Sequence, residues 1–525
     1  MAAGFDVGEF LEGFVDVLAA LFEVGSAGGD LVQEVDELAF FAGFGVVHVD
    51  DGGDFVEGEA EAFAAEDEAQ ADAVARVVDA DGAAALGGEQ AAVLVEPDRS
   101  QRDVVLGGEF GDRPGLRGLV HAPSVLYVYV SVKHRECVMF ELSEEHREFR
   151  QSVRDFAEAE IAPHAAEWDR KHYFPVEVVQ KMGRLGLFGL TAPEEYGGSA
   201  GDFTSLCVAI EEISRVDQSM GITLEAAVGL GINPILTFGT DEQKQQWLPD
   251  LVAGRNLAGF GLTEPESGSD AGATKTRAVL DGDEWVIDGS KQFITNSGSS
   301  ITSCVTVTAR TGEKPDGRPE ISTIIVPTGT AGFVAEAAYD KLGWHASDTH
   351  PLSFGGCRVP AGNLLGERGK GFAQFLATLD DGRVAIAAVA LGCIRACLEM
   401  SVQYAGERKT FGVPIGQKQG VAFQISDLKV MADAAEMLVY RAAALKDAGA
   451  SMADFKQAAS VAKLYATESA VTATRIATQV FGGYGFMEEY PVTRFYRDAK
   501  ILEIGEGTSE VQRMLIARSL GLPVE

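Results

Sequence analysis

The order in which helical and strand-like segments follow one another most constrains how this 525-residue chain can fold. Residues 139–258 and 371–525 carry apolar positions three or four apart, a spacing typical of helices. Between them, residues 259–370 hold short β-type runs such as 305–309 and 321–327. We therefore expect an α+β protein with an N-terminal all-α domain, a middle β domain and a C-terminal helical bundle.

Local signals place individual elements. Ser143 is a plausible N-cap for a first helix that ends by Pro163, and Asp281-Gly282-Asp283 is a hairpin turn between two strands within 279–289. Neither a strand–GxGxxG–helix unit nor a Walker A loop is present, so a nucleotide-type cofactor would have to be held by another device. Further helices are expected at 175–186, 202–217, 241–253, 371–405, 420–448, 454–481 and 509–520.

The first 138 residues differ sharply in composition from the rest. They hold 28 Asp and Glu against 7 Lys and Arg, a net charge of −21, whereas the remaining 387 residues have a net charge of −15. Acidic, Gly/Ala-rich stretches tend to stay disordered. We expect Met139 to be the true start of the protein and residues 1–138 to be a translation of upstream sequence that was wrongly assigned to it. The alternative is that residues 1–138 form an acidic tail or an extra domain specific to the lineage.

Charge and cysteine usage narrow the class of protein. A net charge of −36 disfavours binding to nucleic acid and to anionic lipid, although a local basic pocket can still bind an anionic substrate. The six cysteines are scattered, which fits a reducing cytoplasm, and we expect no metal site. Apolar runs look shorter than about 18 residues or broken by acids, and no secretory or transit signal is present, so we expect no membrane span.

Five motifs could carry chemistry, and each taken alone is also typical of ordinary structure. In chain order, the first four could equally be a polar turn, a strand end, a solvated helix end and a helix C-cap. The fifth contains Glu506 between two glycines, where a loop glutamate in solvent is the plain alternative. Ser509 and Gln512 have capping-box spacing, so a helix is expected to begin just after Glu506. The motifs are FGLTEPESGSDAG at 260–272, KQFITN at 291–296, ERKTFGVPIGQKQ at 407–419, QVFGGYG at 479–485 and YRDAKILEIGEGTSEVQR at 496–513.

Together and in this order, the motifs resemble the acyl-CoA dehydrogenase family over about residues 139–522. LTEPESGSDAG is similar to the family's flavin loop, and YRDAKILEIGEGTSEVQR is similar to its catalytic segment. The resemblance implies that the middle domain is a β-barrel or sandwich and that the C-terminal domain is a four-helix bundle. It also implies an FAD-dependent enzyme, usually a homotetramer, that oxidises an acyl-CoA thioester to a trans-2-enoyl-CoA and passes electrons to an electron-transfer flavoprotein. A flavin oxidase or monooxygenase on the same fold, and a non-catalytic binding or assembly protein, are the alternatives.

The resemblance also assigns residues. Glu506 would remove the α-proton while hydride passes to flavin N5, with Ser269, Asp380, Arg383 and Gly507 next to the substrate. The FAD of a neighbouring subunit would be contacted by Arg408, Phe411, Gln419, Gln479, Gly482 and Gly483. The expected FAD contacts are Phe260, Leu262, Thr263, Gly268, Ser269, Phe293, Ile294, Thr295, Arg408, Phe411, Gln419, Gln479, Gly482, Gly483, Thr508 and Glu510.

Three positions depart from the family pattern. Some relatives place the base immediately before the substrate arginine, where this chain has Gly382, so Glu506 is the expected base here. Gly505 stands where a tyrosine often flanks the base, and Phe293 stands where many members have tryptophan. The two glycines leave room near the thioester, which suggests a short branched or medium acyl chain.

Overall fold

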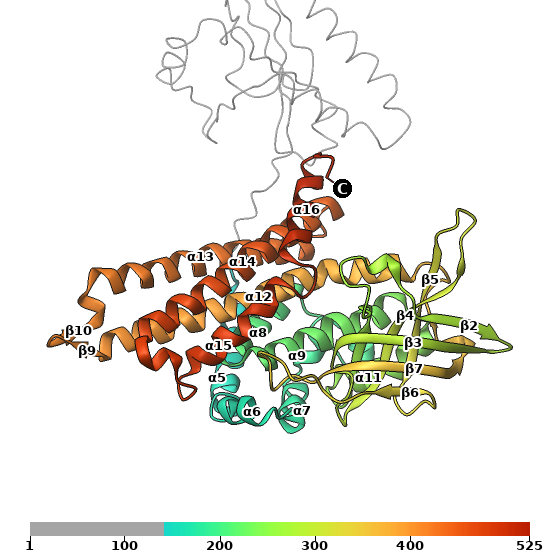
Figure 1. Ribbon diagram of the computed structural model, residues 1–525, viewed down its shortest axis with the longest axis horizontal. Helices are drawn as coiled ribbons and strands as arrows, with labels where there is room; N and C mark the ends of the chain where they lie inside the picture. The colour runs from blue at the N-terminus through green and yellow to red at the C-terminus, as the bar shows by residue number, and fades with distance from the viewer. Residues whose placement is uncertain (1–140, 525) are drawn as a thin grey trace, which may run out of the picture. The chain divides into compact units, whose positions relative to one another are not determined.

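The computed structural model describes residues 141–524, which fold as helices, a mixed sheet and a second set of helices (Figure 1). The predictions made for residues 1–138 lie outside this range. The expected α+β class is confirmed, with helical N- and C-terminal parts around a sheet.

The first helix shows how local sequence sets an element's start. Helix α5 spans Glu144–Glu160, and the hydroxyl of Ser143 accepts the backbone N–H of His146 at 3.1 Å, as expected for the N-cap. A π-helical stretch at Ala226–Ile232 joins two later helices and was not foreseen. The remaining helices of this part are α6 (Ala165–Lys171), α7 (Val176–Arg184), α8 (Phe203–Val216), α9 (Gln218–Glu225), α10 (Asn233–Phe238) and α11 (Asp241–Val252).

The middle part is one eight-stranded mixed sheet in the order β6-β7-β3-β2-β4-β5-β8, with β1 paired to β4. The predicted hairpin forms: Asp281 pairs with Glu284 across Gly282, whose φ of +66° suits glycine. Strands β1 and β2 run parallel to β4, whereas the other pairings are antiparallel. The strands are β1 (Leu257–Gly261), β2 (Arg277–Asp281), β3 (Glu284–Thr295), β4 (Thr302–Glu313), β5 (Pro319–Pro327), β6 (Phe333–Ala335), β7 (Thr349–Pro360) and β8 (Leu364–Leu365).

Three long helices dominate the C-terminal part and lie alongside one another, with the sheet near the N-terminal end of α12 (Figure 1). Thr508 caps the last helix by accepting the N–H of Val511 at 3.3 Å, so the expectation that Ser509 caps it is wrong by one residue. The elements are α12 (Gly371–Glu407), α13 (Gln419–Asp447), α14 (Met452–Phe481), α15 (Pro491–Ala499) and α16 (Ser509–Ser519), with a small hairpin of β9 (Lys409–Thr410) and β10 (Val413–Pro414).

Helix α12 runs through the core and packs against α8 and α14. It is one of two runs in the described residues, with Gln218–Phe238, that are long and apolar enough to cross a membrane. The expectation that all apolar runs are short or broken by acids is therefore wrong for α12. In both runs most of the apolar window, 72% and 78%, is buried within the protein, as in core helices of folded domains.

We predict that Gly392→Ala destabilises the protein by about 1–3 kcal/mol, because α12 meets the backbone of α8 at this residue. A Cβ at Gly392 would lie 2.4 Å from the carbonyl oxygen of Glu211 and 2.9 Å from the amide nitrogen of Arg215. Gly406→Ala is the matched control, since the same helix has open space there. Thermal unfolding of the two variants tests this, and equal melting temperatures would contradict the close packing.

Candidate active site

Glu506 lies on a turn between the end of α15 and the start of α16. Its backbone is left-handed, with a φ of +55°, and Gly507 follows at +89°. A non-glycine residue in this region carries strain of about 1–3 kcal/mol, which the surrounding structure must offset. The buried amide of Gln512 contributes by donating to the carbonyl oxygen of Gly507 at 3.0 Å. The turn thereby directs the Glu506 side chain inward.

The carboxylate of Glu506 rests against Gly382 of α12. A Cβ at residue 382 would lie 2.1 Å from Oε2 of Glu506, closer than any side chain can approach. This oxygen is buried and makes no hydrogen bond to any described residue. Gly382, expected to be unable to serve as a base, thus provides the space that the carboxylate at 506 occupies.

Opposing effects set the protonation of Glu506. Burial raises its pKa to about 7, while the positive charges of Lys463 and Arg383 act to lower it. Arg383 is itself hydrogen-bonded to Asp380 one turn earlier on α12, and Lys456 contacts the other oxygen of Asp380 at 3.1 Å. The structure thus brings Arg383, a predicted substrate residue, near the predicted base, and Asp380 is bound to Arg383.

A second buried carboxyl, Glu225, faces the same region from the C-terminal end of α9. Both of its oxygens are buried and lack a hydrogen-bond partner among the described residues. Burial is the main cause that raises its pKa well above the usual range, and the charge of Glu506 adds to it. Sequence reasoning missed this residue, although a lone carboxyl within the apolar run ITLEAAVGLGI was a usable signal.

The loop after β1 is fixed by a buried ion pair. Lys291 of β3 is fully buried and bonds the carboxylate of Glu264 at 2.7 Å and the carbonyl oxygen of Leu262 at 3.1 Å. Glu264 also accepts the backbone N–H groups of Lys275 and Thr276 at 2.6 and 3.0 Å. Removing either charge would leave the other buried and unpaired, so the pair holds the loop in one conformation.

The predicted flavin-contact residues of the sheet converge on this loop. The backbone N–H of Gln292 donates to the carbonyl oxygen of Thr263 at 2.8 Å, which ties the loop to β3. An irregularity in the pairing of β3 with β7 follows, and within it Phe293 has a φ of +61° and is 63% exposed. Phe260 is buried and stacks on Phe375 of α12, with ring centroids 3.9 Å apart.

Six further predicted flavin contacts form a second group far from the first. They occupy the end of the bundle where α12 and α14 terminate and α13 begins, and all are exposed to solvent. Helix α12 is about 55 Å long at 1.5 Å per residue, so its two ends cannot contact one bound cofactor. This second group comprises Arg408, Phe411, Gln419, Gln479, Gly482 and Gly483.

Helix α15, which leads into the Glu506 turn, is anchored on two sides. Asp498 is buried and accepts the backbone N–H of Trp344, from the loop before β7, at 2.6 Å. Burial raises the pKa of Asp498 to about 7. Arg494 donates to the carbonyl oxygen of Val216 at the end of α8 at 2.9 Å. These bonds connect the sheet and the N-terminal helices to the segment that carries Glu506.

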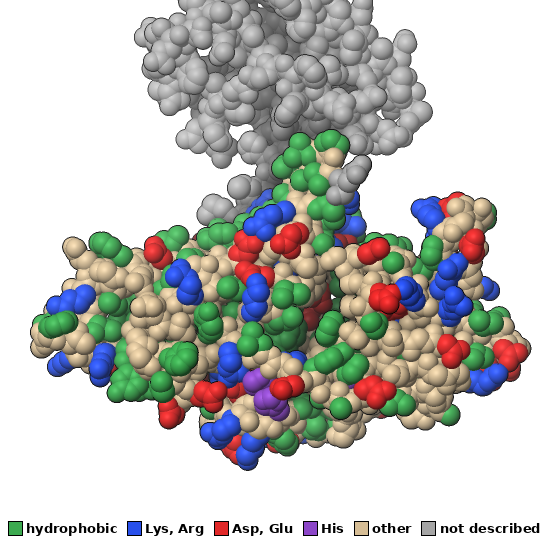
Figure 2. All heavy atoms as spheres, in the orientation of Figure 1, with side chains coloured by type: hydrophobic (Ala, Val, Ile, Leu, Met, Phe, Trp, Pro, Cys, Tyr) green, Lys and Arg blue, Asp and Glu red, His purple; other side chains and the backbone are tan. Residues whose placement is uncertain are grey.

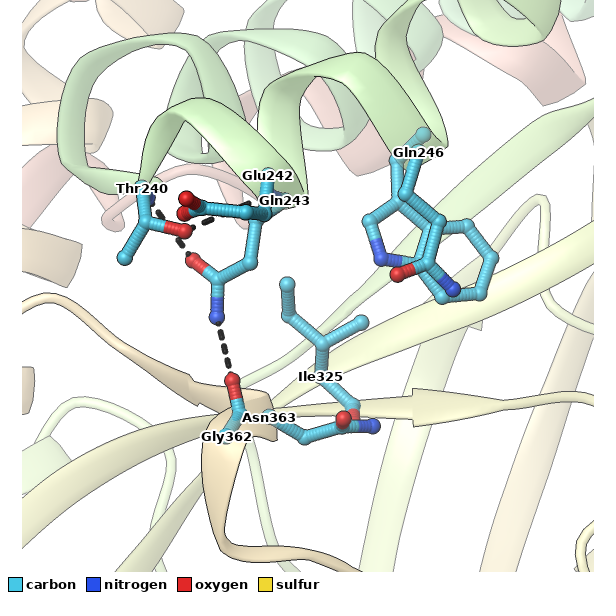
Figure 3. A pocket seen from close by; sticks show the side chains of 8 residues that line it. Thr240, Glu242, Gln243, Gln246, Ile325, Gly362 and Asn363 are labelled. Carbon is cyan, nitrogen blue, oxygen red and sulfur yellow. Dashed lines mark hydrogen bonds between the residues drawn. The ribbon is translucent and has the colours of Figure 1, made fainter.

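Surface cavities also open among the described residues. A cavity of about 410 Å³ lies between α11 and the sheet, where the Gln243 amide donates to the carbonyl oxygen of Gly362 at 2.9 Å (Figure 3). It holds no predicted site residue. A second, of about 340 Å³, is bordered by Asp380, Asp381 and Lys446. The space-filling view shows acidic and basic side chains intermixed, with a recess between the bundle and the sheet (Figure 2).

Comparison with known proteins identifies the family. Models of the acyl-CoA dehydrogenase N-terminal, middle and C-terminal domains match residues 143–255, 259–357 and 369–521. The chain belongs to the acyl-CoA dehydrogenase family. It is an FAD-dependent oxidoreductase, as the resemblance of its motifs predicted.

The relatives match nearly their full length. A probable acyl-CoA dehydrogenase of Bacillus subtilis, YngJ, is 49% identical over 73% of this chain and 99% of its own. The mouse mitochondrial short-chain specific acyl-CoA dehydrogenase is 43% identical over 72% of this chain and 91% of its own. The structure of butyryl-CoA dehydrogenase from Megasphaera elsdenii aligns with a TM-score of 0.69 and 41% identity, covering 73% of this chain and 99% of that one.

A fourth match bears on electron transfer. A chain from a structure of the electron-transferring flavoprotein of Acidaminococcus fermentans aligns with a TM-score of 0.70 and 42% identity, covering 73% of this chain and 99% of that one.

The residues of this chain fit a bound flavin. Around Gly268 no atom lies within 4 Å of where a Cβ would be, and exposed Ser269 and half-buried Thr263 offer backbone and hydroxyl donors on the fixed loop. Thr508 and Glu510 lie at the N-terminal end of α16, where the helix dipole favours negative groups. Such a donor set suits a pyrophosphate and a ring edge, and the individual contacts stay predictions.

We predict that Gly382→Ala lowers kcat roughly 100-fold, because the new methyl group must displace the Glu506 carboxylate from its position on α12. The flavin should remain bound, since the loop after β1 is untouched. Steady-state kcat and the visible flavin spectrum test this against Gly406→Ala, which adds a methyl group to open space on the same helix. Wild-type kcat in the flavin-loaded Gly382→Ala variant would contradict it.

Proposed function

We propose that the chain dehydrogenates a short-chain acyl-CoA to the trans-2-enoyl-CoA, with Glu506 as the base that removes the α-proton. The observation that carries this proposal is the Glu506 carboxylate, held against Gly382 with one oxygen buried and unpartnered. A carboxylate oxygen without hydrogen bonds from water or from the protein is more basic, so it can accept a proton from a weak carbon acid.

The residues around Glu506 favour this step in two ways. Burial brings its pKa to about 7, which makes it a stronger base than an exposed glutamate and still leaves much of it ionised at neutral pH. The thioester oxygen would be polarised by the backbone N–H of Glu506, and a donor of this kind contributes about 3–4 kcal/mol. Bound FAD supplies the acceptor for the β-hydride.

Support for a short acyl chain comes from the relatives. The mouse enzyme and one from Clostridium acetobutylicum, 44% identical, are named short-chain specific, and the Megasphaera elsdenii structure is a butyryl-CoA dehydrogenase. We therefore propose a short straight-chain thioester such as butyryl-CoA, in fatty-acid catabolism, in preference to a branched or medium chain.

Assembly and electron transfer form part of the same proposal. The second group of predicted flavin contacts lies too far along α12 to serve the chain's own cofactor, which supports a homotetramer in which it contacts a neighbour's FAD. We propose an electron-transfer flavoprotein as acceptor, because a structure of such a protein from Acidaminococcus fermentans contains a chain of this fold.

We predict that Glu506→Gln lowers kcat by about 10²–10⁴, since it keeps the shape and removes the base. In the wild type, kcat/KM should fall tenfold per pH unit below about 7, because the ionised carboxylate is the active form and its pKa is raised to that value. Glu144→Gln, at an exposed carboxylate of α5, is the control. Full turnover in flavin-loaded Glu506→Gln would remove the base assignment.

We predict that butyryl-CoA bleaches the enzyme-bound flavin fastest in an anaerobic panel that also contains isovaleryl- and octanoyl-CoA. The rate of loss of visible flavin absorbance is the measurement. A branched or eight-carbon substrate that reacts tenfold faster than butyryl-CoA would overturn the short straight-chain assignment. Rapid recovery of colour in air would favour the oxidase alternative over a dehydrogenase.

A further inference from the structure

Helix α14 carries a buried ammonium group whose role the reaction above leaves open. The side chain of Lys463 is completely excluded from solvent, and its Nζ donates to the carbonyl oxygen of Gly507 at 2.8 Å. Within residues 141–524 no carboxylate lies within 4.0 Å of Nζ, so Lys463 has no direct ion pair. Burying an ammonium group without such a partner destabilises the folded protein. An apolar side chain at this position, or a lysine at the surface, would not carry this penalty.

Within residues 141–524, the one hydrogen bond of the Lys463 ammonium group is made to the turn that carries the base. Gly507 follows Glu506, and both have left-handed backbones. The carbonyl oxygen of Gly507 accepts two donors, Nζ of Lys463 at 2.8 Å and the amide of Gln512 at 3.0 Å. One donor comes from α14 and the other from α16, so side chains of two helices hold the strained turn in place.

Glu506 is the carboxylate that the charge of Lys463 acts on most, because the other charged groups around Lys463 are paired elsewhere. Of the neighbouring groups, Glu503 is paired with Lys500 and Glu468 with Arg513. Arg383 is paired with Asp380, and burial raises the pKa of Glu225 well above its usual range. The charged groups that act on Lys463 are Glu506, Glu503, Arg383 and Glu468, in that order.

We propose that Lys463 is a positioning residue that anchors the Glu506–Gly507 turn and, as the nearby uncompensated cation, keeps the base ionised in its desolvated site. This inference rests on the proposed role of Glu506. Lys463 acts through the turn and through its charge and does not touch the reacting atoms. The protonation of the lysine agrees with this role: burial lowers its pKa to about 8, so most of it is charged at neutral pH.

The test is the pH profile of kcat/KM in Lys463→Met, which keeps the length and apolar stem and removes the charge and the donor. Without the cation, we expect the acidic limb to move up by about one pH unit or more. The loss should therefore be tenfold or greater near pH 6 and small near pH 9. Lys463→Arg, which retains a cation, should restore most of the wild-type limb.

Two controls separate this role from a merely structural one. Lys429→Met removes the same charge from the exposed face of α13, where the lysine pairs only with Asp433, and should leave the profile unchanged. Flavin content per chain is measured for every variant. A Lys463→Met enzyme that is slower by one factor at all pH values, with its acidic limb unmoved, would overturn the inference, and so would a wild-type profile.

Two further results keep the outcomes distinct. If Lys463→Met fails to bind flavin, Lys463→Gln, which keeps a donor for Gly507 and lacks the charge, replaces it under the same criterion. Glu506→Gln reports on the proposed function separately: full turnover there defeats the base assignment. If Glu506→Gln abolishes turnover and the acidic limb of the Lys463→Met profile does not move, the base assignment stands and only the proposed role of Lys463 is overturned.

Discussion

The contact between the Glu506 carboxylate and the bare backbone of Gly382 is the constraint on which the rest of the site depends. It requires a glycine on α12, a left-handed turn before α16, and a fixed distance between this glycine and the turn. The glycine is set by the sequence. The turn and its distance from α12 follow from packing, because α12 contacts α14 and α14 contacts α16. The site therefore needs the whole bundle to place one carboxylate.

Much of the architecture could be predicted because its signals are local. Periodicity indicated the long helices, Ser143 marked the start of the first one, and Gly282 marked a hairpin. Local signals also limit precision. Thr508 and Ser509 are adjacent hydroxyl residues, and either can cap a helix, so the pattern could not tell which one does so. The π-helical stretch after α9 was missed because its two glycines, Gly229 and Gly231, indicate a weakened helix but not the hydrogen-bond spacing it adopts.

The site was predictable only where a motif carried it. Glu506, Asp380 and Arg383 come from two distant segments, and the sequence shows no physical reason for them to meet. Lys463 was missed for the same reason, since a charge on a helix becomes informative only when its neighbours from other helices are known. Glu225 was missed although the apolar run around it is a local signal of burial. That Glu225 faces the same region as Glu506 depends on how the helices approach one another and cannot be inferred from α9 alone.

The unbroken length of α12 has a consequence for how this protein can change. Gly382 stands in one half of the helix and Arg408 directly follows its other end. In a helix of 3.6 residues per turn, inserting or deleting one residue between them would rotate one end by about 100° relative to the other. Substitutions along the helix can be absorbed one at a time, whereas a single-residue length change would put the two ends out of phase. We therefore expect evolution to have preserved the residue count between these positions even where identities drift.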